Sequence, residues 1–326
     1  MIRTPSSFIE KNATQILLEN RWGSHFVKER LAQEDRLQRG ELPIRFFAHE
    51  IEESHHAFKI ITLFLRLLEL YPVGIKNALN IQTTYQRFAL SSLPKQFQPL
   101  RILQLSDLHI DGYRGFGHHL RKKIEPLEFD LAIITGDYSF DLTQGFEETY
   151  QELLALIPAL DCRYGVYGIL GNHDSLYSVS KLEGLGIQML VNERVQIRTP
   201  EGDFWLIGVD DPHHFQLHNL SKALEGVPPQ EPSILLSHSP ELISQASQMG
   251  IDLYLTGHTH GGQFCLPGGL SLFANARCDR RYIRGRWFHE NMSGYTTSGT
   301  GSSGIFARFN CPPEVCIHTL VPLEPA

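Results

Sequence analysis

Six short apolar runs constrain the fold of this chain more than any other feature of its sequence. They cover residues 101–105, 131–135, 165–170, 204–209, 234–236 and 253–256. Amphipathic stretches separate them, and strands that alternate with helices are typical of a layered α/β domain. A last apolar segment, residues 315–321, is expected to be a closing strand. The sequence therefore predicts an α/β domain after residue 100.

Polar motifs rich in Asp, Asn and His follow most of these runs. They are Ser106-Asp107-Leu108-His109, Gly136-Asp137, Gly171-Asn172-His173-Asp174, Ser237-His238 and Gly257-His258-Thr259-His260. Ligands of open α/β sheets bind just beyond the carboxyl ends of the strands. We therefore expect the motifs to converge in one cleft.

The donor atoms in these motifs suit metal ions. One Asp after a strand is usually a turn residue and one His is usually structural, but the joint occurrence of two Asp, one Asn and four His at strand ends is not explained in that way. Oxygen and imidazole donors without sulfur suit Mn²⁺, Fe, Zn²⁺ or Mg²⁺. Seven donors exceed what one tetrahedral metal can use. We expect two divalent metal ions, with Mn²⁺ as the first candidate.

In sequence order, the motifs read D-x-H, G-D, G-N-H-[DE], H and G-H-x-H, which resembles the calcineurin-like metallophosphoesterase family over roughly residues 80–326. The resemblance implies an αββα fold, a β-sandwich flanked by helices, here with an N-terminal helical extension. It also implies a dinuclear-metal hydrolase of phosphodiester or pyrophosphate bonds. Two cations about 3.5–4 Å apart can acidify a water and neutralise phosphoryl oxygens.

The resemblance assigns a role to each donor of this sequence. One metal would be held by Asp107, His109 and His260, the second by Asn172, His238 and His258, and Asp137 would bridge them. His173 would stand at the leaving-group oxygen as proton donor, with Asp174 orienting its imidazole. Such a donor typically contributes about 10²–10⁴-fold in rate.

Several flanking stretches look like the bacterial membrane-associated phosphodiesterase branch of the family. They are Leu100-Arg101-Ile102, Tyr164-Gly165-Val166-Tyr167, Gly208-Val209-Asp210-Asp211-Pro212, Gly261-Gly262-Gln263 and Cys311-Pro312-Pro313-Glu314. Members of that branch often begin with a transmembrane helix and include enzymes that act on lipid-linked phosphates. The resemblance thus implies a phosphoester substrate that is lipid-linked, such as a nucleotide-linked lipid or another anionic amphiphile.

The N-terminal part of the chain differs in character. Residues 1–78 are expected to form a mostly helical region and residues 79–326 the catalytic domain, with one or two solvated helices in residues 1–42. A helix with a narrow polar stripe is predicted within residues 43–71. Its apolar run is shorter than the ~20 residues of a spanning helix and carries charges, so it should not cross a bilayer. It either packs on the catalytic domain or makes a peripheral membrane contact through residues 58–70.

Charge limits the partners. Lys and Arg total 29 against 36 Asp and Glu, a net charge of -7, so no nucleic acid partner is expected. Local charge is reversed after the last motif, where aromatic side chains interleave with Arg277, Arg280, Arg281, Arg284 and Arg286. Guanidinium groups suit phosphate, so the first four are candidate substrate-binding residues. The alternative is an exposed loop whose arginines pair with acids such as Asp279.

The five cysteines form no C-x-x-C pair and the N-terminus lacks a secretory signal pattern. We therefore expect a cytoplasmic protein, with the inner membrane surface as a peripheral site. Two alternative functions stay open: a soluble cyclic-nucleotide phosphodiesterase or general phosphomonoesterase, and, in another class, a non-catalytic scaffold on the same fold. The complete donor set and His173 argue against the scaffold.

Overall fold

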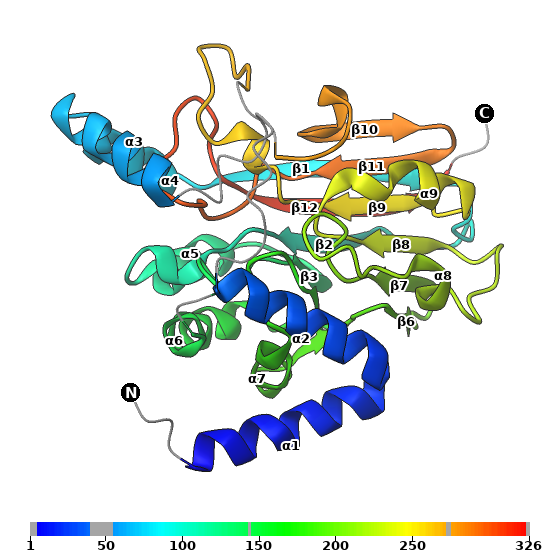
Figure 1. Cartoon of the computed structure of the whole chain (residues 1–326). Coiled ribbons are helices and arrows are strands. Elements are labelled where there is room, and N and C mark those ends of the chain that lie inside the picture. The colour runs from blue at the N-terminus through cyan, green and yellow to red at the C-terminus, as the bar shows by residue number, and fades with distance from the viewer. Residues whose placement is uncertain (1–4, 40–54, 143–144, 272–274, 324–326) are drawn as a thin grey trace.

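The computed structural model describes residues 5–39, 55–142, 145–271 and 275–323 (Figure 1). Its strands are β1 Gln82–Leu90, β2 Leu100–Leu105, β3 Leu131–Thr135, β4 Val166–Ile169, β5 Ile187–Met189, β6 Glu193–Ile197, β7 Phe204–Gly208, β8 Ser233–Leu236, β9 Leu253–Thr256, β10 Gly285–His289, β11 Met292–Thr296 and β12 Glu314–Pro322. Its helices are α1 Pro5–Trp22, α2 Ser24–Gln38, α3 His55–Leu67, α4 Tyr71–Leu79, α5 Phe116–Ile124, α6 Glu147–Leu156, α7 Val179–Gly184, α8 Leu220–Ala223 and α9 Ile243–Gln248.

The strands form two six-stranded sheets, one in the order β1-β12-β2-β3-β4-β5 and the other in the order β10-β11-β9-β8-β7-β6. Apolar side chains from both sheets form one buried cluster between them, with Ile102 and Ile133 from the first sheet and Leu206 and Leu236 from the second. Two further clusters join the outer faces to helices, the first sheet to α5 and α6 and the second to α8 and α9. These layers confirm the predicted αββα architecture.

Parallel pairing places the carboxyl ends of several strands at a common edge. Strands β2, β3, β4 and β5 are parallel neighbours, and so are β7, β8 and β9. Each predicted run coincides with a strand to within about one residue at each end, and the predicted closing strand is β12. The sequence did not reveal β1, because its alternating exposure leaves no continuous apolar run. It pairs in parallel with β12.

The N-terminal helices α1 and α2 pack on the layer that covers the outer face of the first sheet, where both contact residues 176–178. Their Leu18, Trp22, Val27 and Leu31 side chains belong to the same buried cluster as the outer face of that sheet. The expectation of solvated helices is wrong for α2, because Arg30 of this helix is 0% exposed. The polar composition of the segment concealed this burial, since Arg30 is paired with Asp210, far away in the sequence, as well as with Glu34 of the same helix.

Helix α3 projects from the body of the molecule at the upper left of Figure 1. One side of it faces the protein, where Leu65 is buried and the Phe58 ring lies so close to Gly304 that a Cβ atom there would overlap it. The other side exposes four side chains at helical spacing, which we call the α3 apolar face: Ile60, Leu63, Phe64 and Leu67. Residues 43–54 of the predicted helix lie outside the described residues. Among the described helices, none combines the length and apolar character needed to cross a membrane.

Candidate metal centre

The strand-end motifs meet in two clusters of metal-ligating side chains. Asp107, His109 and His260 offer ligand atoms that lie within 4.8 Å of one another, and so do Asp137, His238 and His258. Asp107 follows β2, Asp137 follows β3, and the four histidines follow strands of both sheets. The structure thus brings together residues that are up to 153 positions apart in the sequence (107 to 260).

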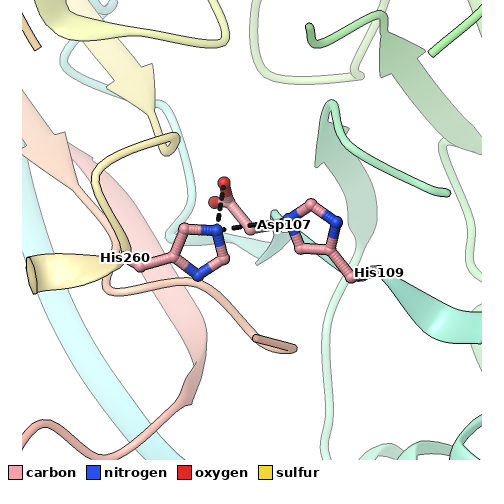
Figure 2. Close-up of side chains that lie close together, drawn as sticks. All are labelled: Asp107, His109 and His260. Atoms are coloured by element: carbon pink, nitrogen blue, oxygen red, sulfur yellow. Dashed lines mark hydrogen bonds and ion pairs between the residues drawn. The ribbon is translucent and has the colours of Figure 1, made fainter. Parts of the chain in front are cut away.

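In the first cluster, the side chains of Asp107, His109 and His260 point toward one another (Figure 2). The Nε2 atoms of His109 and His260 are 3.2 Å apart, and His260 Nε2 is 3.4 Å from Asp107 Oδ1. Ligand atoms about 2.0–2.2 Å from one metal ion lie roughly 3–3.5 Å from each other, so these spacings fit a shared cation.

The second cluster centres on His238. Its Nε2 atom is 3.2 Å from Asp137 Oδ2, 3.1 Å from Asn172 Oδ1 and 3.2 Å from His258 Nδ1. Asp137 Oδ2 is also 3.6 Å from His109 Nε2 in the first cluster. The Asp137 carboxylate therefore stands between the two sets of donors, where a bridging ligand has to be.

The protein backbone fixes the tautomers of two of these histidines. His109 Nδ1 is 2.9 Å from the carbonyl oxygen of Ser139, and His238 Nδ1 is 2.8 Å from that of Thr135. A carbonyl can only accept, so each Nδ1 carries a proton and each Nε2 faces the centre. His258 turns its Nδ1 atom to His238, and its buried Nε2 atom has no hydrogen-bond partner among the described residues.

Five donors hold an unusual backbone conformation. Positive φ angles occur at Asp107 (51°), His109 (37°), Asp137 (57°), His258 (70°) and His260 (48°). Residues with a Cβ atom rarely adopt this left-handed region, and it costs of order 1–3 kcal/mol where the surroundings impose it. Such strain gathers at functional sites. Its presence at five of the seven expected donors supports a functional arrangement.

The glycines of the motifs give the donors room. A Cβ atom on Gly257 would overlap Ser106 Oγ and crowd the carboxylate of Asp107. A Cβ atom on Gly171 would overlap Asp137 Oδ1. These close approaches explain why glycine stands next to a donor in the Gly257-His258 and Gly171-Asn172 pairs.

The charges of the site suit cation binding. Burial lowers the pKa of His109 to about 3 and lowers those of His258 and His260 far below the usual value, so these imidazoles are neutral. Burial alone would raise the pKa of Asp137, but His238 and other imidazoles hold it well below its usual range. Burial would lower the pKa of His238, but Asp137 raises it well above the usual value. A cation that binds here therefore has to displace the proton of His238.

His173 and Asp174 occupy different positions in the site. The His173 ring is half-buried and stands edge-on to the His109 ring, with centroids 4.9 Å apart. The Asp174 carboxylate is fully buried and accepts the backbone N–H groups of Asp137 at 2.7 Å, Tyr138 at 2.9 Å and Gly171 at 2.9 Å. This geometry favours a role in shaping the Asp137 loop over the predicted role of orienting the His173 imidazole.

Sequence reasoning did not identify Arg308, which contacts a donor directly. Its guanidinium is fully buried, 3.1 Å from His260 Nδ1 and 3.2 Å from the His260 carbonyl oxygen. Arg308 lies in an irregular loop, residues 298–311, and no motif or periodicity of the sequence marks it.

The arginines after the last motif differ in their contacts. Arg284 lies beside the metal-binding loop, since a Cβ atom on Gly261 would be 3.1 Å from its Cδ. Arg277 donates its backbone N–H to Glu241, and Arg281 pairs with Asp279 at 3.6 Å, as the alternative reading expected. Arg280 is exposed. Arg286 instead lies on β10, where it donates to the carbonyl oxygen of Arg87.

Comparison with known proteins gives consistent matches. The calcineurin-like phosphoesterase family matches residues 100–262, which is half of the chain. An uncharacterized metallophosphoesterase of Bacillus subtilis, YkoQ, is 29% identical over 68% of this chain and 83% of its own length. The phosphodiesterase YaeI of Escherichia coli is 31% identical over 72% of this chain and 87% of its own length. A bovine transmembrane protein with a metallophosphoesterase domain is 34% identical over 59% of this chain and 47% of its own length.

Proposed function

This chain belongs to the calcineurin-like phosphoesterase family, whose members are metal-dependent hydrolases, and we propose that it cleaves phosphodiester or pyrophosphate bonds with two divalent ions, Mn²⁺ first among them. The observation that carries the proposal is the pair of ligand clusters joined by Asp137. We assign Asp107, His109 and His260 to one ion, Asn172, His238 and His258 to the other, and Asp137 to both.

The residues around the ions have different proposed roles. Bound at these donors, two divalent cations neutralise charge on a phosphoryl group and lower the pKa of a water molecule. In the described part of the chain, two histidine rings contact that of His109: His173, which is half-buried, and His260, which is buried. The His173 imidazole can therefore meet a substrate that the buried donors cannot. We assign it the proton for the leaving-group oxygen. Asp174 keeps the Asp137 loop in place.

The proposed substrate is an anionic amphiphile, such as a nucleotide-linked lipid. Arg284 supports this assignment because it lies next to Gly261, directly after the His260 donor. We assign Arg277, Arg280, Arg281 and Arg284 to phosphate groups of the substrate, with Arg284 the best placed. Guanidinium forks bind phosphate oxygens in a bidentate manner.

A membrane contact through residues 58–70 fits this substrate. The α3 apolar face leaves Ile60 69% and Leu67 73% exposed, which costs free energy in water. The loop 298–311 connects this helix to the metal centre, because Gly304 contacts Phe58 while Arg308 contacts His260. The bovine relative is a transmembrane protein by name. We propose that α3 holds the enzyme at the cytoplasmic membrane surface, with the centre one loop away.

Metal reconstitution tests the proposed reaction. Metal-stripped protein should be inactive and should regain activity with Mn²⁺, reaching two equivalents of metal at full activity, because both clusters are needed to neutralise the phosphoryl group. The measurement pairs metal analysis with initial rates on a nucleotide-lipid pyrophosphate, a cyclic nucleotide, a soluble diester and a monoester. Preference for the cyclic nucleotide or the monoester would establish the alternative enzymes. A loaded protein that hydrolyses none of them would be a scaffold.

Co-sedimentation with vesicles tests the membrane contact. With phosphatidylglycerol–phosphatidylethanolamine vesicles, the double variant Leu63→Gln, Leu67→Gln should bind about 10-fold or more weakly than wild type, because a fully buried Leu contributes roughly 1.5–3 kcal/mol. Leu154→Gln, which changes an exposed leucine of α6, is the matched control and should bind like wild type. Equal pelleting of all three proteins, or no pelleting of wild type, would contradict the contact.

A further inference from the structure

Helix α2 carries a buried group of charges that reaches the metal centre. Arg30 is 0% exposed, Glu34 3% and Asp210 0%. Arg30 pairs with Glu34 at 2.7 Å and with Asp210 at 3.2 Å, and its guanidinium lies 3.2 Å from the centroid of the Phe215 ring. Three charges have thus been removed from water at the junction between α2 and the catalytic domain.

Arg30 and Glu34 hold the segment that follows β4. Arg30 Nη2 donates to the carbonyl oxygen of Asp174 at 2.9 Å. Glu34 accepts from Ser175 Oγ at 2.6 Å and from the backbone N–H of Leu176 at 2.8 Å. The donor Asn172 lies two residues before Asp174. The Asp174 carboxylate in turn accepts the backbone N–H of Asp137, so the hydrogen bonds extend from Arg30 to the Asp137 loop.

Arg30 also holds a second segment, which follows β7. Its partner Asp210 begins the turn, and the neighbouring Asp211 carboxylate accepts the backbone N–H groups of His213 at 3.1 Å, His214 at 2.6 Å and Phe215 at 2.9 Å. The turn sets the His213 ring against the His258 ring, with centroids 4.3 Å apart. One guanidinium therefore fixes the surroundings of Asn172 and of His258, both donors of the second cluster.

We propose that Arg30 and Glu34 are positioning residues for the second metal ion. Helix α2 then contributes to metal binding as well as to packing. This inference rests on the metal assignment proposed above. Helix α2 lies outside the residues 100–262 that match the family. Docking alone does not explain the charges, because apolar side chains would dock a helix without the cost of desolvating ions. Directed hydrogen bonds from a guanidinium do fix two segments relative to each other.

Stepwise Mn²⁺ titration of the metal-stripped full chain tests this inference. In Arg30→Met the affinity for the second Mn²⁺ should fall about 10- to 100-fold, the usual loss when a residue that orients a ligand is changed, while the first Mn²⁺ binds nearly as in wild type. Arg30→Lys should recover part of the loss because it restores the charge. The readout is binding measured by calorimetry and Mn²⁺ EPR, with kcat recorded in parallel.

Arg21→Met is the matched control. Arg21 anchors α1 through Glu193 at 2.9 Å and Glu183 at 2.7 Å, away from the donors, so this variant should lower Tm and still bind two Mn²⁺ with wild-type affinities. Where Arg30→Met does not fold, Glu34→Gln gives the same readout with less disturbance. If wild type binds two Mn²⁺ ions and the Arg30 or Glu34 variant binds both with unchanged affinity, this inference is overturned and the metal assignment stands. If wild type binds fewer than two Mn²⁺ ions, the metal assignment is overturned and this inference with it.

Discussion

Asp137→Asn is expected to weaken the binding of both metal ions and to lower kcat by about 10²-fold or more. Substitutions of residues that only hydrogen-bond to a metal ligand already lower metal affinity or activity about 10- to 100-fold. Asp137 Oδ2 is 3.2 Å from His238 Nε2 and 3.6 Å from His109 Nε2, so one substitution removes negative charge from both clusters. Asn keeps the size of the side chain and an Oδ1 acceptor for the His173 N–H, 2.9 Å away in wild type. The loss would therefore report charge rather than shape.

Metal content by elemental analysis, taken with kcat at saturating Mn²⁺, checks this expectation. Asp161→Asn removes an exposed carboxylate outside both clusters and serves as the control. This variant should bind two ions and have wild-type activity. A fully loaded wild type with at most one ion would contradict the bridge. Loss of only one ion in Asp137→Asn would assign the carboxylate to a single cluster.

Local sequence explains why the clusters could be predicted. Asp107, Asp137 and His258 each stand two positions after a strand of apolar residues, and parallel strands deliver their ends to one edge. The positive φ angles of these residues could not be predicted, because a left-handed donor is forced by its surroundings and not by its own preference. The αββα layering came from the family resemblance, while the apolar runs indicated only an α/β domain.

Long-range polar contacts account for what the sequence did not reveal. Arg30 and Asp210 are 180 residues apart, and Arg308 and His260 are 48 apart, so no periodicity links either pair. A charged residue on a polar helix predicts solvent exposure, and only the tertiary structure shows that Arg30 is buried against two carboxylates. The same argument applies to Asp174, whose carboxylate accepts hydrogen bonds from backbone N–H groups of two separate loops.

The position of His173 supports the proton-transfer role that we propose for it. Its backbone N–H is tied to Asp137 Oδ1 at 2.9 Å, which places the residue at the centre without using its imidazole. The imidazole stands edge-on to His109 at 4.9 Å between ring centroids and is half-buried, whereas His109 and His238 are fully buried. A side chain that contacts a donor and is still partly exposed to solvent fits the proposed contact with the leaving group of a phosphoester.

His173→Ala should therefore keep both Mn²⁺ ions and lose about 10²-fold or more in kcat on a substrate with a poor leaving group, because general-acid groups contribute about 10²–10⁴-fold. The loss should shrink for a nitrophenyl ester, whose leaving group departs without a proton. His118→Ala, at an exposed histidine of α5, is the control and should match wild type. The deciding measurement is the ratio of the two losses, since a disturbed metal site would slow both substrates alike. Loss of metal in His173→Ala, or full activity on the poor leaving group, would contradict the assigned role.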